Sequence, residues 1–332
     1  MHMVDALISP AVAGTMYVAS AAVAGYSVKK VREENDPKKI PVMGVMGAFV
    51  FAAQMINFTI PGTGSSGHLC GGILLSAILG PYAGFLTMIG ILLTQCLFFA
   101  DGGLLALGCN IWNMAFYGCF IGSFLIWKPM MKGGITKTKI IIASIVASVI
   151  TLQMGAFSVV LETTISGISE LPFSSFVSVM LPIHLAIGFV EGVVSAAVLC
   201  FIHSARPELL WCSDPQSEGK GTLSLKKTLT VMSVITLFVG GVLSLFASAF
   251  PDGLEWSIGK LIGDAEIVNG ADPYAAAEQI QSSTSFLPDY GFAGSESALG
   301  TTVSGIVGCL IVVAICFAAA YLFKFFRKRK EA

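Results

Sequence analysis

Nine long apolar runs constrain the fold of this chain more than any other feature of its sequence. They occupy residues 8–28, 40–58, 66–79, 81–100, 104–127, 138–163, 173–203, 227–250 and 299–323. A helix that crosses a bilayer needs about 20 predominantly apolar residues, and most of these runs meet that length. Only 12% of the residues are charged, against about 25% in a typical soluble domain. The pattern predicts an all-α, polytopic membrane protein surrounded by membrane lipid.

The stretch 66–100 is the exception, because Gly80 and Pro81 divide it into a short apolar segment and a longer one. Proline is tolerated in the first turn of a helix but not in its interior, so we interpret this stretch as a tight helical hairpin. If the N-terminus lies outside, every Lys and Arg except Lys260 falls in one of four inside segments, 29–39, 128–139, 203–227 and 324–330. The positive-inside rule requires this distribution, and a single span over 66–100 would break it.

The same pattern divides the chain into two units. Residues 1–203 are expected to form a seven-helix bundle, residues 204–226 a cytoplasmic linker, and residues 227–332 a two-helix module with a large exterior loop. Against the single base Lys260, that loop carries the acidic residues Asp252, Glu255, Asp264, Glu266, Asp272, Glu278, Asp289 and Glu296. An acidic surface attracts cations weakly and at long range, although exterior loops also avoid Lys and Arg for topological reasons alone.

The chain begins Met1-His2, and a free start of this kind offers three nitrogens to one ion. With Met1 retained, its amine, the backbone nitrogen of His2 and the His2 imidazole close fused five- and six-membered chelate rings. Once the amide is deprotonated, such a set favours the square-planar geometry of Ni(II) or Cu(II). Any protein can begin Met-His by chance, so the argument depends on finding a fourth ligand.

A segment rich in Gly and Ser, residues 59–72, places His68 at the mouth of a helix on the same side of the membrane as His2. Glycine lets the backbone fold tightly, and irregular backbone at membrane depth is tolerated only where it is buried or lines a cavity. A lone His at a helix start is commonly a cap or a solvated residue. Beside a three-nitrogen N-terminus, His68 becomes the candidate fourth ligand of a square plane.

Five other polar residues are expected to surround these ligands, namely Gln54, Asn57, Ser66, Asp101 and Asn110. The first two flank the Gly-rich segment and are candidates to hydrogen-bond a ligating His, while the last two bracket the next exterior turn. On the seventh span, His184 and Glu191 lie two helical turns apart. We expect an interhelical hydrogen-bond network there, without metal contact.

Two further groups of residues are expected to play no part in metal binding. Glu162 is expected in water near an exterior helix end. The eight cysteines have no metal-site spacing and are interpreted as small core residues.

Several motifs resemble the CbiM/NikM family, the substrate-capture (S) components of energy-coupling factor (ECF) transporters for cobalt and nickel. They are the initial Met-His, FAAQMINF at 51–58, the Gly-rich segment running into Gly67-His68-Leu69, and DGGLLALGCN at 101–110 followed by Asn113-Met114. The resemblance covers about residues 1–203. The second unit, with PDGLE at 251–255 and FLPDY at 286–290, resembles the two-span, NikN-like PDGLE module.

The resemblance implies the substrate-binding membrane component of an ABC-type transporter that imports Ni(II). It implies that the metal is held by the Met1 amine, the His2 amide and imidazole, and the His68 imidazole, which coincides with the chelate argument. It also implies a transmembrane coupling (T) subunit and two cytoplasmic ATPases as partners. The chain itself has no phosphate-binding loop ending in Lys-Ser/Thr and is expected to need no cofactor. The expected location is a prokaryotic cell (inner) membrane, with the N-terminus outside and the C-terminus cytoplasmic.

Other interpretations remain open. Co(II) import for cobalamin synthesis is the alternative to nickel, and the sequence does not rank the two firmly. An ion-driven secondary transporter would show inverted repeats and paired broken helices, whereas one break is seen, at Gly80-Pro81. An intramembrane metalloprotease would need a motif such as His-Glu-x-x-His, which does not occur. The formal net charge of -1 gives no indication of a nucleic-acid partner.

Small residues on the first span, among them Ala11, Gly14, Ala21 and Gly25, permit close packing. The sequence does not decide whether they meet another span or the coupling subunit.

Overall fold

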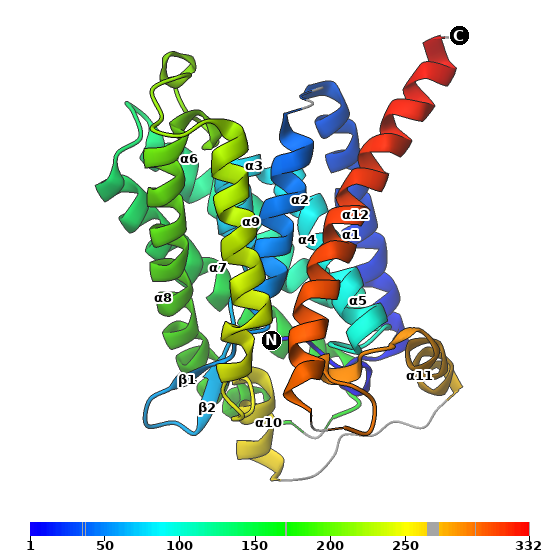
Figure 1. Ribbon diagram of the computed structural model, residues 1–332. Coiled ribbons are helices and arrows are strands. Elements are labelled where there is room, and N and C mark those ends of the chain that lie inside the picture. Colours follow the sequence, from blue (N-terminus) through cyan, green and yellow to red (C-terminus); the bar gives the residue numbers. More distant parts are fainter. Residues whose placement is uncertain (35, 37, 170, 264–271, 296, 332) are drawn as a thin grey trace.

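The computed structural model describes residues 1–332 apart from 35, 37, 170, 264–271, 296 and 332, and its helices stand side by side in one bundle (Figure 1). The chain is 76% helical. Within the described residues, seven helices are long and apolar enough to cross a membrane. The predicted all-α, polytopic architecture is therefore confirmed.

The first unit begins with a short turn, η1 (Asp5–Leu7), and α1 (Pro10–Glu34), followed by α2 (Lys39–Gln54). A two-stranded hairpin, β1 (Phe58–Ile60) and β2 (Ser65–Gly67), leads into α3 (Gly72–Leu79) and α4 (Pro81–Phe99). One continuous span then consists of α5 (Leu107–Asn110), η2 (Ile111–Trp127) and α6 (Lys128–Met131). The unit ends with α7 (Lys137–Ser166) and α8 (Phe173–Ala205), which pack along each other.

The helix break at Gly80-Pro81 falls where the sequence predicts it. Gly80 has φ 80° and ψ 165°, a conformation that glycine adopts readily because it has no Cβ. Helix α3 has eight residues and rises only about 12 Å, so it cannot cross a membrane alone. At the end of α3, the N–H of Trp211 donates to the carbonyl of Ala77 at 2.8 Å. The end of α3 thus reaches the linker.

The linker carries the short turns η3 (Pro207–Leu209) and η4 (Pro215–Ser217) and leads to the second unit. That unit consists of α9 (Leu225–Gly241), η5 (Leu243–Phe246), α10 (Gly253–Ile262), α11 (Asp272–Thr284), η6 (Pro288–Tyr290) and α12 (Ala298–Glu331). Helices α9 and α12 pack against each other and against α2. They cross very closely, since a Cβ on Gly305 would lie 2.0 Å from the carbonyl oxygen of Gly240.

The segment predicted as a large exterior loop is largely helical and covers one end of the bundle. We call this the Met1 end, where β1, β2, α10 and α11 lie, and we call the opposite end the linker end (Figure 1). Helix α10 packs against α8 and β2, and α11 against α4. Three acidic residues of this segment, Asp264, Glu266 and Glu296, lie outside the described residues.

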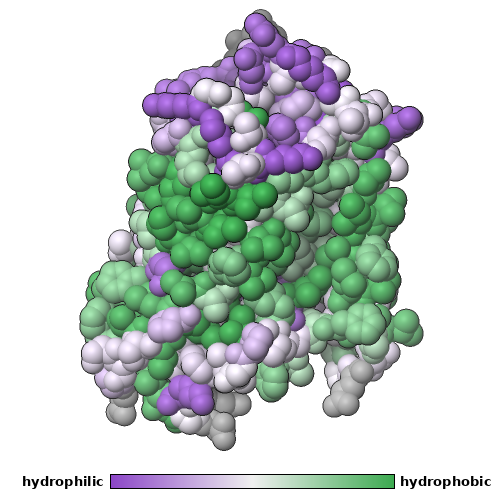
Figure 2. Space-filling model, turned by 90° about the vertical axis from the view of Figure 1, so that its left-hand side faces the viewer, coloured by the Kyte–Doolittle hydropathy of each residue, from purple (hydrophilic) through white to green (hydrophobic). Residues whose placement is uncertain are grey.

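The surface agrees with a membrane location. Figure 2 shows a hydrophobic band across the middle of one face, with strongly hydrophilic residues gathered at one end and a mixed surface at the other. Many large apolar side chains of α7, α8 and α9 are exposed, among them Ile150, Phe189 and Leu237. Exposed apolar area of this extent is stable in lipid and would be unfavourable in water.

Candidate metal centre

The first residues of the chain run into the Met1 end of the bundle and are held there by side chains. The backbone N–H of Met3 donates to Oδ1 of Asn110 at 2.7 Å, and Nδ2 of Asn110 donates to the carbonyl of Met3 at 3.1 Å. The N–H of Gly103 donates to the same carbonyl at 2.9 Å, and Asp5 accepts from the N–H of Ala106 at 2.9 Å. Met1 is only 4% exposed. These contacts fix the position of the chain start.

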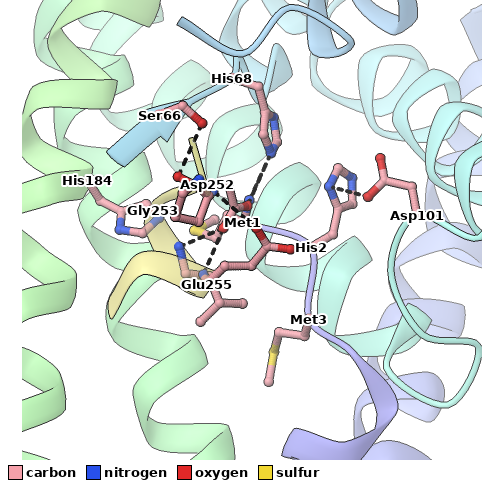
Figure 3. A network of polar contacts seen from close by, with 12 residues as sticks. Met1, His2, Met3, Ser66, His68, Asp101, His184, Asp252, Gly253 and Glu255 are labelled. Atoms are coloured by element: carbon pink, nitrogen blue, oxygen red, sulfur yellow. Dashed lines mark hydrogen bonds and ion pairs between the residues drawn. The ribbon is translucent and has the colours of Figure 1, made fainter. Parts of the chain in front are cut away.

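The Gly-rich segment brings His68 to the same place. β1 and β2 pair antiparallel, with Phe58 opposite Gly67, and His68 follows directly. Its Nδ1 lies 3.0 Å from the carbonyl oxygen of Leu69. A carbonyl oxygen only accepts, so the hydrogen of the neutral ring lies on Nδ1 and the lone pair on Nε2. Nε2 points at the N-terminus (Figure 3).

The structure brings the three candidate metal ligands together. The amino nitrogen of Met1 lies 2.8 Å from Nε2 of His68. The rings of His2 and His68 are stacked with centroids 5.1 Å apart and an interplanar angle of 17°. Among the described residues there is no cluster of three or more His, Cys, Asp or Glu side chains placed to hold a metal.

Two carboxylates contact the same groups. Oδ2 of Asp252 lies 2.5 Å from the amino nitrogen of Met1 and 3.8 Å from Nε2 of His68. Oδ1 of Asp101 lies 3.1 Å from Nδ1 of His2, and Oδ2 of Asp101 accepts from the hydroxyl of Tyr290 at 2.5 Å. Asp252 and Tyr290 both belong to the second unit. That unit therefore contacts the N-terminal ligands both directly and through Asp101.

Sequence reasoning missed Asp252 as a residue of the site, although its local setting explains its position. Its Oδ1 accepts from the N–H groups of Leu254 and Glu255 at 2.8 and 2.9 Å, and Glu255 accepts in return from the N–H of Asp252. This reciprocal capping box fixes the start of α10. Because Oδ1 is occupied by the helix, Oδ2 is left to face the amine. The sequence did carry one indication, because an acidic residue followed three positions later by Glu, as in Asp252 and Glu255, is typical of a helix start.

Electrostatics favour an ion pair between these two groups. Burial is the largest single effect on the Met1 amine and by itself would lower its pKa, but Asp252, with smaller effects from Cys70 and Asp101, holds that pKa above its ordinary 8.0. Burial by itself would raise the pKa of Asp252, yet the amine of Met1 and the ring of His68 together hold it well below its ordinary value. Burial lowers the pKa of His2 to about 4. At neutral pH the amine is thus protonated, Asp252 ionised and His2 neutral.

Two hydrogen-bonded glutamines link the ring of His2 to the backbone of the Gly-rich segment. Nε2 of His2 lies 3.2 Å from Oε1 of Gln95, and Nε2 of Gln95 donates to Oε1 of Gln54 at 3.0 Å. Nε2 of Gln54 donates in turn to the carbonyl of Cys70 at 2.7 Å. Gln54 therefore acts on His2 only through Gln95, which sequence reasoning missed. The side chain of Gln95 points inward from an otherwise apolar helix, and intramembrane polar residues of this kind usually have a function.

Three expectations about neighbouring residues need correction. Asn57 is half-buried and contributes a backbone contact, since its carbonyl accepts from the N–H of Ser248. Ser66 faces the second unit, because its hydroxyl donates to the carbonyl of Phe250 at 2.7 Å. Glu162 is buried rather than solvated, and it accepts from Nδ2 of Asn113 at 2.7 Å. Asp101, expected among the residues around the candidate ligands, does contact the ring of His2.

The expected network of His184 and Glu191 is present only in part. Glu191 links α8 to the Gly-rich segment, since its carboxylate accepts from the N–H groups of Cys70 and Gly71 at 2.8 and 3.0 Å. Nδ1 of His184 instead lies 2.7 Å from the carbonyl oxygen of Met180 on its own helix. The two side chains thus have separate partners.

Comparison with known proteins gives a consistent result for both units. The sequence model of the CbiM family, described as "Cobalt uptake substrate-specific transmembrane region", matches residues 2–209, and that of the PDGLE domain matches residues 226–325. A protein named as the fused nickel transport protein NikMN from Archaeoglobus fulgidus is 34% identical over 322 residues, which is 96% of this chain and 97% of that protein.

Two further relatives match a smaller part of the chain. The cobalt transport protein CbiM from Sorangium cellulosum is 30% identical over 179 residues, covering 54% of this chain and 80% of that protein. The crystal structure of a truncated transition metal transporter superposes with a TM-score of 0.54 and 29% identity, covering 61% of this chain and 98% of the other. The fold and the sequence motifs thus agree.

Proposed function

This chain belongs to the CbiM family of cobalt-uptake transmembrane regions, joined to a PDGLE domain as in fused NikMN proteins, and we propose that it captures Ni(II) as the substrate-binding component of an ECF-type transporter. The proposal assigns the metal to four nitrogens in a square plane. They are the amine of Met1, the amide and imidazole of His2, and Nε2 of His68.

One distance supports this geometry above all others. A metal–nitrogen bond is about 2.0–2.1 Å long, so neighbouring nitrogens of a square plane lie about 2.8–3.0 Å apart. The amino nitrogen of Met1 and Nε2 of His68 lie 2.8 Å apart. The lone pair of His68 already points into this space, because Nδ1 carries the hydrogen. Little rearrangement is needed for both atoms to bind one ion.

The remaining two nitrogens require specific changes. The amide of His2 has to lose its proton, as in any chelate of this type. Nδ1 of His2 faces Asp101. To complete the six-membered ring it has to leave that carboxylate and bind through its lone pair, with the hydrogen of the neutral ring on Nε2 toward Oε1 of Gln95. The amine of Met1 has to lose one proton and leave Asp252. The two carboxylates thus hold the ligands in position before an ion takes their place, and metal binding releases protons.

Nickel is favoured over cobalt by the donor set. Four nitrogens in a plane suit Ni(II) or Cu(II), and Ni(II) binds more tightly than Co(II) at a given site in the Irving–Williams order. The relative from Archaeoglobus fulgidus, which aligns over both units, is named for nickel. Co(II) remains the alternative, because the family description and the Sorangium cellulosum relative refer to cobalt.

Energy for import has to come from partners, for which we propose a transmembrane coupling subunit and two cytoplasmic ATPases. Helix α1 supports a membrane partner. Its small residues Ala11, Gly14, Ala21 and Gly25 are exposed, and a Cβ on Gly14 or Gly25 would meet no other atom within 4 Å. Such a surface permits close approach of another helix. By the positive-inside rule we place the Met1 end outside the cell and the linker end in the cytoplasm.

Metal content under competition tests the proposal. The purified full chain is offered equal concentrations of Ni(II) and Co(II), and bound metal is measured together with the absorption spectrum and magnetic moment. We expect about one diamagnetic, square-planar Ni(II) per chain. A paramagnetic, six-coordinate ion would contradict the four-nitrogen site, and a preference for Co(II) would establish the alternative substrate.

A further inference from the structure

His184 presents a free nitrogen to the interior of the site. Because its Nδ1 faces the carbonyl of Met180, that nitrogen carries the hydrogen of the neutral ring and Nε2 carries the lone pair. The residue is 1% exposed. In the part of the chain that the structure describes, Nε2 has no hydrogen-bond partner. A ligating His typically has this arrangement, with one ring nitrogen bound to a backbone carbonyl and the other free.

This nitrogen faces a small cavity beside the proposed square plane. The cavity has a volume of about 10 Å³, and its lining includes Met1, His68, Cys70, His184 and Asp252. A space of this size holds about one water molecule or one small ion. Figure 3 shows His184 and His2 on opposite sides of Met1. The cavity therefore lies next to the amine, away from the ring of His2.

Gly253, the first residue of α10, also lines this cavity and keeps it open. A Cβ on Gly253 would lie 2.9 Å from Cε1 and 3.2 Å from Nε2 of His184. It would also lie 2.9 Å from Cδ1 of Ile187. Any larger residue at this position would press on the imidazole.

The other nitrogens of the site are all engaged. Nε2 of His68 lies against the amine of Met1, and the two ring nitrogens of His2 face Asp101 and Gln95. The amine and the amide both carry hydrogens that have to leave before they bind metal. Among the nitrogens described at this site, Nε2 of His184 is the one that can bind an ion without first losing a proton or a partner.

We propose that His184 is the first ligand of the arriving divalent ion, at a position that the ion occupies before it enters the square plane. Nε2 replaces one water on the ion. The amine of Met1 and the amide of His2 then each lose one proton to solvent water, and their nitrogens bind the ion. As the square plane closes, the ion leaves His184. This inference rests on the proposed function and adds an order of binding to it.

Loading kinetics of the full chain test the order. In His184→Leu the imidazole is replaced by an apolar side chain without a donor. We expect the rate of Ni(II) loading, measured by stopped-flow absorbance, to fall by at least about ten-fold. This is the lower end of the effect of losing a residue that supports a metal site. Equilibrium affinity should stay near the wild-type value. His184→Met supplies a sulfur donor of adaptable shape and should restore part of the rate.

Two glycine variants provide a matched pair that leaves His184 in place. Gly253→Ala narrows the cavity and should slow loading as His184→Leu does. Gly259→Ala is the same change on the same helix, where a Cβ would meet no atom within 4 Å, and it should load at the wild-type rate. These variants keep the test valid even if His184→Leu does not fold.

Either of two results would overturn the inference. Loading at the wild-type rate in both His184→Leu and Gly253→Ala would show that the ion does not pass His184. Equal loss of rate and equilibrium affinity in His184→Leu would place His184 in the final coordination. A wild-type chain that binds neither Ni(II) nor Co(II) would instead overturn the proposed function, and the inference with it.

Discussion

The amino nitrogen of Met1 and a carboxylate oxygen of Asp252 lie 2.5 Å apart, although 251 positions separate the two residues in the sequence. The contact joins the chain start, which carries the proposed ligands, to the capped first turn of α10 in the second unit. The carboxylate occupies the place next to the amine that an incoming cation would take. In the proposed site, proton, carboxylate and metal would therefore compete at a single nitrogen.

Blocking the amine of Met1 should abolish tight metal binding. Acetylation, or one residue added before Met1, removes the donor that closes the five-membered chelate ring. We expect Ni(II) affinity, measured by equilibrium dialysis, to fall by at least about ten-fold while helical content is unchanged. One residue inserted between Gly133 and Gly134, where a Cβ would meet no atom within 4 Å, is the control. Unchanged affinity of the blocked chain would exclude the amine as a ligand.

His68→Ala should weaken Ni(II) binding by at least about ten-fold, because loss of one nitrogen opens the square plane. The control is His203→Ala at the linker end of α8, which should bind as the wild type does. The measurement is titration calorimetry of both variants. If His203→Ala loses affinity and His68→Ala keeps it, the site has been placed at the wrong end of the bundle.

Metal affinity should rise with pH, since the raised pKa of the Met1 amine keeps it protonated at neutral pH. Asp252→Asn removes the charge that raises this pKa, so its binding curve should begin to rise at a lower pH than that of the wild type. Asp272→Asn, an acidic residue at the start of α11, is the matched control. Ni(II) affinity is measured from about pH 6 to 10, and a curve displaced by about one pH unit corresponds to about 1.4 kcal/mol. Superimposable curves for the wild type and Asp252→Asn would refute proton competition at the amine.

A chain that ends within residues 206–221 should still enter the membrane and bind Ni(II), because every proposed nitrogen ligand precedes the cut. Since it lacks Asp252, its binding curve should also begin to rise at a lower pH than that of the wild type. Uptake in cells should fall more than affinity, because the second unit no longer covers the Met1 end. Equal loss of binding and uptake would show that the second unit completes the site, and full uptake would show that it is dispensable.

The spans could be predicted from the sequence because bilayer thickness imposes a length and a composition on each one. The break at Gly80-Pro81 was equally accessible, since both residues have strong local preferences. The expected spans 40–58 and 66–79 extended too far, because residues 55–71 contain a hairpin instead of helix. The apolar residues in this stretch made it look like a continuation of the membrane helices, although it does not form a helix.

The candidate ligands were named from the sequence, and the structure brings them together, whereas most of the residues that contact them could not be predicted. Met1, His2 and His68 carry chemistry that a sequence reveals, because an N-terminal His chelate depends on neighbours in the chain. Asp252 and Gln95 meet these ligands only through the fold. Glu162 lies near a helix end where water was expected, but the amide of Asn113 from the adjacent span satisfies it in the interior.

The linker is hydrogen-bonded to the first unit, and this fixes the point from which the second unit is tethered. The N–H of Trp211 donates to Ala77, and Nε1 of Trp127 donates to the carbonyl of Trp211 at 3.1 Å, so the tether starts from a fixed point. A tether turns an encounter between separate subunits into an intramolecular event, with an effective concentration of about millimolar for a short flexible linker. Asp252 is then present at one-to-one stoichiometry with every N-terminus, independently of expression level or dilution in the lipid.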